Sequence, residues 1–151
     1  MTHGSLFGVA VLAATVLSAS SVSSSVEAST LVLGGGLAKD CSTAAIDGRS
    51  DQKSILACTT ALETENLTFR DRARTYVNRG VLQMRQRDFS NARSDFDAAA
   101  KIDPDLGEAW VNRGATYVGQ ERYSEGRQEI DKGLALGVKD PEGLVQSRHG
   151  Q

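Results

Sequence analysis

The chain has 151 residues, of which 40% are hydrophobic and 24% are charged, and its formal net charge is −2. This length accommodates one domain at most, and the composition is that of an ordinary globular chain. The slightly acidic balance offers no basic surface of the kind that nucleic acid requires, so we predict no nucleic-acid partner.

The segment 1–28 has the form of a secretory signal peptide. Leu6 to Leu17 is nearly uninterrupted apolar sequence, but it is shorter than the ~20 residues of a membrane-spanning helix. The serine-rich stretch that follows ends at Val26-Glu27-Ala28, which predicts cleavage after Ala28. We therefore expect segment 1–28 to be removed, no stable membrane span to remain, and the protein to be periplasmic or secreted. An uncleaved anchor is the alternative, because only the amino terminus and His3 precede the apolar run as positive groups.

Residues 29–50 carry little hydrophobic pattern and are predicted to be a flexible N-terminal segment. Gly34-Gly35-Gly36 is typical of a linker. A phosphate-binding loop would need a following Lys-Ser/Thr and a flanking strand and helix, and these are missing. No cofactor is expected.

The two cysteines, Cys41 and Cys58, are an even number in a chain that has the features of an exported protein, and they predict a disulfide. Its loop is close to the ~15 residues for which the chain-entropy model gives about 3 kcal/mol. A lipid anchor on Cys41 is the alternative, although Lys39-Asp40 stands where a lipoprotein signal has small residues.

Helical spacing begins after the turn Asp47-Gly48-Arg49-Ser50 and predicts a helix from about Asp51 to Glu65. Thr68-Phe69-Arg70-Asp71 has the form of a capping box and opens a helix that runs to about Arg87. Asp88 and Ser90 begin its partner, which Ile102-Asp103-Pro104 closes.

A further pair of helices is predicted over residues 107–140. Asp105 with Glu108 opens a helix to about Gly119, and its partner spans Ser124 to Leu136 with Gly137 as its C-terminal cap. Residues 141–151 form a polar tail that is too short for a full capping helix. Since solenoids normally carry such a helix, we expect the last pair to expose apolar surface that a homodimer or a partner would cover.

Two pentapeptides show that the chain repeats. Tyr76-Val-Asn-Arg-Gly80 returns as Trp110-Val-Asn-Arg-Gly114. When residues 73–106 are aligned with residues 107–140 at that offset, they share eight identities, in one early and one late group. This distribution predicts a repeated helix–turn–helix in which each helix keeps its own contact positions.

The repeated residues resemble the tetratricopeptide repeat family. The second unit supplies the first-helix pattern and the first unit the second-helix pattern of that family, in the residues Trp110, Gly114, Tyr117, Ala92, Phe96, Ala99 and Pro104. There are departures from the pattern: Arg79 and Arg113 stand where the family usually has Leu, Gln83 replaces an aromatic residue, and the later small–large–small positions of the second unit are Gly126, Ile130 and Gly133.

The resemblance implies an all-α fold, a short α-solenoid of antiparallel helix pairs with two tetratricopeptide units at 68–106 and 107–140. Gly80 and Gly114 would let a second helix approach closely, with Ala92, Ala99 and Phe96 packed beside them. Cys58 and Leu62 stand one repeat period before Ala92 and Phe96, so residues 51–67 are predicted to be a degenerate half-repeat.

In such a solenoid the first helices line a concave groove, and one face of each shares the side of the asparagine. The partner-binding residues predicted on this face are Arg74, Val77, Asn78, Val81, Met84, Arg85, Glu108, Val111, Asn112, Ala115 and Val118. The family resemblance implies that Asn78 and Asn112 bind the main chain of an extended peptide, since an amide both donates and accepts. The alternative is that they are inherited helix-surface residues. The lysines of a carboxylate clamp have no counterpart, so an acidic chain terminus is not the expected ligand.

Arg79 and Arg113 each have an aspartate at the position +18 along the chain, Asp97 and Asp131. We predict an Arg–Asp contact between the two helices of each unit, for which the guanidinium fork is suited. The alternative is that the arginines hold an acidic peptide.

Catalysis and metal binding are not predicted. After signal removal His149 is the one histidine left, no nucleophile can be assigned to it, and no metal-ligand spacing occurs. We expect a binding protein that holds a protein or peptide partner in the groove. The alternative is a structural subunit that forms a homo-oligomer through its terminal helix faces.

Overall fold

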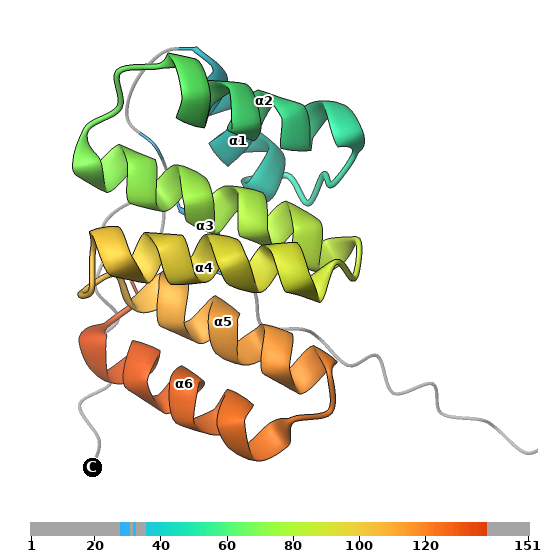
Figure 1. Cartoon of the computed structure of the whole chain (residues 1–151), viewed down its shortest axis with the longest axis vertical. Helices are drawn as coiled ribbons and strands as arrows, with labels where there is room; N and C mark the ends of the chain where they lie inside the picture. Colours follow the sequence, from blue (N-terminus) through green and yellow to red (C-terminus); the bar gives the residue numbers. More distant parts are fainter. Residues whose placement is uncertain (1–27, 31, 33–35, 139–151) are drawn as a thin grey trace, which may run out of the picture.

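The computed structural model describes residues 28–30, 32 and 36–138, and these contain six helices and no strand. The helices are α1 (Leu37–Ile46), α2 (Gln52–Thr64), α3 (Phe69–Arg85), α4 (Phe89–Ile102), α5 (Gly107–Gly119) and α6 (Tyr123–Leu136). They form three antiparallel pairs that stack in chain order along one direction (Figure 1). The predicted all-α solenoid is confirmed.

Side-chain caps set three of the helix starts. Asp51, Thr68 and Asp88 each accept a hydrogen bond from the third backbone N–H that follows, at 3.0, 3.1 and 3.2 Å. Each cap satisfies one of the donors that the first turn of a helix leaves without an intrahelical partner. The starts predicted at Asp51 and Thr68 are therefore confirmed, and α4 begins at the predicted turn.

The first helices of the last two pairs end in the left-handed region at non-glycine residues. Arg87 has φ 62°, and Glu121, at the equivalent position of the next repeat, has φ 63°. In both turns a backbone N–H bonds back across the end of the helix, from Asp88 to the Gln83 carbonyl at 3.0 Å and from Arg122 to the Tyr117 carbonyl at 2.9 Å. Gly137, the predicted glycine cap, has φ 85°. The caps at Arg87 and Glu121 contain no glycine, so the sequence does not indicate them.

Small residues allow the helices of each pair to approach. A Cβ on Gly80 would lie 2.5 Å from the Phe96 ring, which fills the space between α3 and α4. A Cβ on Gly114 would lie 2.6 Å from the Gly126 carbonyl, so the α5 and α6 backbones meet there directly. Gly80 and Gly114 thus stand where the two helices of a pair approach closely. Ala92, Phe96 and Ala99 are fully buried.

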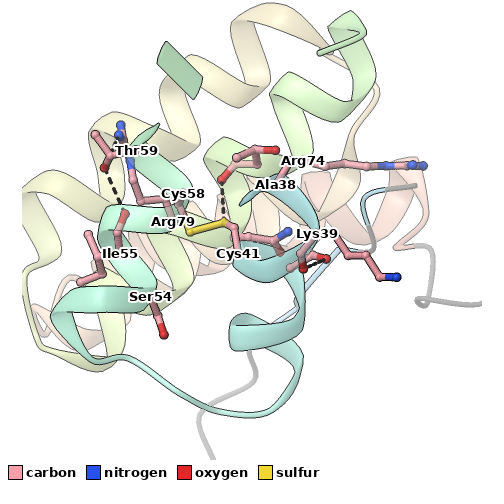
Figure 2. Close-up of a disulfide and its surroundings, with 12 residues drawn as sticks. Ala38, Lys39, Cys41, Ser54, Ile55, Cys58, Thr59, Arg74 and Arg79 are labelled. Carbon is pink, nitrogen blue, oxygen red and sulfur yellow. Dashed lines mark hydrogen bonds between the residues drawn. A yellow bond between two sulfur atoms is a disulfide. The ribbon is translucent and has the colours of Figure 1, made fainter. Parts of the chain in front are cut away.

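The structure differs from prediction over residues 29–50, where helix α1 lies within the segment that we expected to be flexible. It packs on α2 and α3, so the first unit is a helix pair and not a half-repeat. The predicted disulfide is confirmed: Cys41 of α1 is bonded to Cys58 of α2, and both are buried (Figure 2). The alternative of a lipid anchor on Cys41 is thereby excluded.

The sequence does not predict helix α1, because apolar and polar residues are not clearly separated on its two faces. Its buried positions are small residues, Ala38, Cys41, Ser42, Ala44 and Ala45, and it has no side-chain N-cap. A helix of 10 residues is below the length that is stable alone, so tertiary contacts decide whether it forms.

The predicted signal peptide and the predicted tail at 141–151 lie outside the described residues, apart from Ala28. Within the described part of the chain, no helix combines the length and apolarity needed to cross a bilayer.

Candidate functional site

Asn112 on α5 is fully buried, and its amide is paired with the main chain of Ala28. The Ala28 N–H donates to Asn112 Oδ1 at 3.0 Å, and Asn112 Nδ2 donates to the Ala28 carbonyl at 2.6 Å. One side chain therefore satisfies both backbone groups of a residue that is 84 positions away in the chain.

Asn78 on α3 repeats this arrangement two residues further along the same segment. The Thr30 N–H donates to Asn78 Oδ1 at 2.9 Å, and Asn78 Nδ2 donates to the Thr30 carbonyl at 2.7 Å. The two asparagines occupy equivalent positions of successive repeats. Alternate residues of an extended strand point the same backbone groups to the same side, so two equivalent amides can bind residues i and i+2.

Side chains of the bound segment add contacts of their own. Thr30 is only 3% exposed, and its hydroxyl lies 3.2 Å from the Arg74 carbonyl and 3.3 Å from Asn78 Oδ1, to either of which it can donate. The Ser29 hydroxyl donates to the Ala45 carbonyl of α1 at 3.2 Å. The segment thus contacts α5, α3 and α1.

Val32 marks the end of the amide-bound part. It is 3% exposed and lies in an apolar cluster with Ala38 of α1 and Ala61 of α2. In α1, the position one repeat period before Asn78 is occupied by Ala44, whose side chain has no amide group. The polar contacts of the asparagines to the main chain therefore stop at α3, and an apolar contact continues the segment toward the first pair.

The other residues of the predicted groove are placed differently. Val77, Val81 and Met84 belong to the buried core together with Phe96, and Ala115 packs against that core. Val111 and Val118 lie against Gly133 and Gly126 of α6. Arg85 donates to the Ala45 carbonyl at 2.8 Å, and Glu108 is 2% exposed. Of the predicted set, the structure brings Arg74 (through its carbonyl), Asn78 and Asn112 together on one extended segment.

The predicted Arg79–Asp97 and Arg113–Asp131 pairs are wrong by two residues. Arg79 binds Asp95 through two hydrogen bonds of 2.8 Å, and Arg113 binds Glu129 at 2.5 and 3.2 Å. The partner is thus the acid at +16, not at +18. Two residues turn a helix by roughly 200°, so the acids at +16 and +18 face opposite sides.

Each arginine also reaches the second helix of the preceding pair. Arg79 donates to Thr59 of α2 at 3.0 Å (Figure 2), and Arg113 donates to Asp97 of α4 at 2.7 Å. The hydrogen bonds to Asp95 raise the pKa of Arg79, so the guanidinium stays cationic, while burial raises the pKa of Asp95. Because both guanidinium groups are occupied within the stack, these contacts favour the structural role over the binding of an acidic peptide.

The bound segment itself was not predicted. Residues 28–30 stand at the end of the predicted signal peptide and the start of the predicted flexible segment, and nothing local in the sequence shows that Ala28 and Thr30 lie against α5 and α3. The signal that the sequence does contain is the alternation Ala28, Thr30, Val32, in which every second residue is small or β-branched.

Comparison with known families identifies a match within the chain. Residues 73–106 match the family model described as the tetratricopeptide repeat, which covers α4 and all of α3 from Ala73 on. A search of the curated proteins found no match to the chain.

Proposed function

We propose, from the tetratricopeptide repeat at residues 73–106, that this chain is a binding module that holds an extended segment of a partner protein between Asn78 and Asn112. Repeats of this kind generally mediate protein–protein interaction and are typically not enzymatic. The resemblance of residues 68–140 to two such units extends the binding surface to α5.

The observation that carries the proposal is the bonding of both amides to main chain. Asn78 and Asn112 are fully buried, and each satisfies one N–H and one C=O of the segment at 28–30. A buried amide without such partners would cost roughly 1–3 kcal/mol. Since these groups read backbone and not side chains, any extended chain of suitable size can supply the same bonds.

The test is selection of binding peptides from a displayed library of random extended sequences, followed by measurement of their affinity for the full chain and for an Asn78→Ala/Asn112→Ala variant. We expect the double substitution to weaken binding by about tenfold or more, since up to four hydrogen bonds are lost.

Arg127→Ala is the control for this test, because the Arg127 side chain lies on α6, is 85% exposed and contacts neither amide. Circular dichroism must first show equal helical content for the parent and both variants. Equal affinity of the parent and the double variant would contradict the proposal.

A structural subunit is the second candidate, and exposed residues on the last helix favour it. Leu134 and Tyr123 of α6 are 59% and 65% exposed, as expected for an uncovered end of a solenoid. If this face builds a homo-oligomer, Leu134→Ser will shift sedimentation toward monomer, whereas the Asn78→Ala/Asn112→Ala variant will sediment as the parent does.

We also propose that the protein is exported, to the periplasm or out of the cell. The apolar run at Leu6–Leu17 and the Cys41–Cys58 disulfide support this location, since disulfides persist in oxidising compartments. Fractionation of cells that express the full chain, with sequencing of the amino terminus of the product, tests the location. Cleavage after Ala28 would remove the residue whose main chain Asn112 binds, so the contact between them requires a product that retains Ala28, and the same sequencing checks this.

A further inference from the structure

The side-chain amides of Asn78 and Asn112 are already bonded to the chain itself. Ala28 and Thr30 take all four of the amide hydrogen bonds that a partner would need. A partner segment and residues 28–32 therefore compete for the same atoms, and one must leave before the other can bind.

The contacts of the bound segment also define which side chains fit. Thr30 and Val32 are each 3% exposed, whereas Ala28 at the Asn112 end is half-buried. A large or charged side chain at the Thr30 position would meet the α3 backbone at Arg74, to which the threonine hydroxyl lies within 3.2 Å. Ser29, between the two amide-bound residues, is only half-buried.

We infer that the partner of this groove is an extended segment with a small or β-branched residue at every second position, and that residues 28–32 are a tethered competitor that this segment displaces. The inference rests on the proposed function. It adds the sequence class of the ligand and the requirement that the groove must first be vacated.

The tether makes this competition effective. Only residues 33–36 separate Val32 from the start of α1, and a short linker gives a local concentration on the order of millimolar. A partner binds in proportion to the fraction of molecules in which the segment has left. An opening population of roughly one in ten, for example, would weaken the apparent affinity about tenfold.

The test uses the full chain with two substitutions at one position. Thr30→Pro removes the N–H that donates to Asn78, whereas Thr30→Val keeps that N–H and the β-branched shape and removes only the hydroxyl. The probe is a fluorescent peptide with the sequence of residues 28–32, flanked by glycines and capped at both ends, and its binding is followed by fluorescence anisotropy.

We expect the Thr30→Pro protein to bind the probe at least about tenfold more tightly than the Thr30→Val protein. Ala28→Pro, which removes the donor to Asn112, should act in the same direction and serves if Thr30→Pro does not fold. In the probe, tryptophan in place of the threonine should abolish binding, while alanine in place of the serine, which loses only the hydrogen bond to the Ala45 carbonyl, should weaken it by less than about tenfold. Equal affinity of both proline variants and Thr30→Val, or tolerance of the tryptophan, would overturn the inference.

Two further outcomes separate this inference from the proposed function. If library-selected peptides bind through Asn78 and Asn112 but the probe does not, the tethered-competitor inference fails and the binding module stands. If no peptide binds to any variant, both fail. A parent protein that sediments as a dimer, and becomes monomeric on Thr30→Pro, would show that the segment comes from a second copy, which also overturns the tethered arrangement.

Discussion

Arg79 and Asp95 form a largely enclosed ion pair between α3 and α4. The Asp95 side chain is 6% exposed and that of Arg79 is 19% exposed, and two hydrogen bonds of 2.8 Å join them. Removing one member of such a pair leaves a charge without its partner in a region of low dielectric. Asp97, two residues along, is 52% exposed and binds Arg113 from the helix surface.

Asp95→Ala should therefore lower the free energy of unfolding by about 2–4 kcal/mol, somewhat below the range for fully buried pairs because Arg79 retains some solvent. Asp97→Ala should cost about 0–1 kcal/mol, as exposed pairs do. Urea denaturation followed by the fluorescence of the single tryptophan, Trp110, measures both. A larger effect at Asp97 than at Asp95 would restore the pairing at +18.

Gly114 is a second position where one atom decides the packing. A Cβ there would lie 2.6 Å from the Gly126 carbonyl and 2.7 Å from Ile130 Cγ1. Gly114→Ala gains about 1 kcal/mol of helix propensity, but it forces α5 and α6 apart. We expect a net loss of about 1–3 kcal/mol. A melting temperature above that of the parent would show that the two backbones can separate at little cost.

At the level of elements, the disulfide fixes α1, the shortest of the described helices. Helix α1 has 10 residues and no side-chain N-cap, and the bridge from Cys41 to Cys58 closes a loop with a sequence separation of 17. The chain-entropy model gives about 3 kcal/mol for a loop of this size.

We expect Cys41→Ala/Cys58→Ala to lose about 3 kcal/mol of stability and to lose hydrogen-exchange protection first in α1. Protection in α5 and α6 should change little, because they belong to the other end of the stack (Figure 1). Reduction of the parent protein with dithiothreitol is the matched control and should give the same pattern. Uniform loss of protection along the chain would mean that the bridge supports the whole stack and not α1 in particular.

The ends of α3 and α5 store strain that glycine would relieve. Glu121 has φ 63°, and a non-glycine residue in this region carries a steric cost of about 1 kcal/mol. Glu121→Gly should raise the stability by up to about 1 kcal/mol, less the extra freedom of glycine in the unfolded chain. Gln120→Gly is the control, because Gln120 has φ −101° and gains nothing from the change. Thermal denaturation that ranks Gln120→Gly above Glu121→Gly would contradict this.

The elements differ in how far the sequence predicts them. Helices α3 and α4 follow from their side-chain caps, and all four helices α3 to α6 follow from the repeat period and from the contrast between apolar and polar faces, which can be read along the chain. Helix α1 gives no such contrast, because alanine and serine occupy its buried face. The acid that pairs with Arg79 and the placement of residues 28–32 depend on how helices from distant parts of the chain are rotated and stacked, which spacing alone does not specify.

For the molecule as a whole, stability should fall from the middle of the stack toward α6. Helix α3 buries eight residues and touches helices on both sides, whereas α6 buries only Gly126 and Gly133 and, within the described part of the chain, packs on α5 alone. In a stack held by nearest-neighbour contacts, such an end opens most readily.

Native-state hydrogen exchange should therefore show the greatest protection in α3 and α4 and the least in α6. The difference should disappear if a ligand or a second copy covers the α6 face. Equal protection of α3 and α6 in the free monomer would mean that the three pairs open together as one cooperative unit.

Because Asn78 and Asn112 are equivalent, the number of repeats that carry such an asparagine sets the length of the extended segment that the stack binds. Each of the two repeats contributes one amide, and successive amides bind residues two apart in an extended chain. A duplicated repeat that carried asparagine at the same position would lengthen the recognised segment by two residues. In the present molecule the series of asparagines ends at Ala44 of α1. The recognised segment could therefore be lengthened by repeats added at the α6 end of the stack, without a change in the contacts already made.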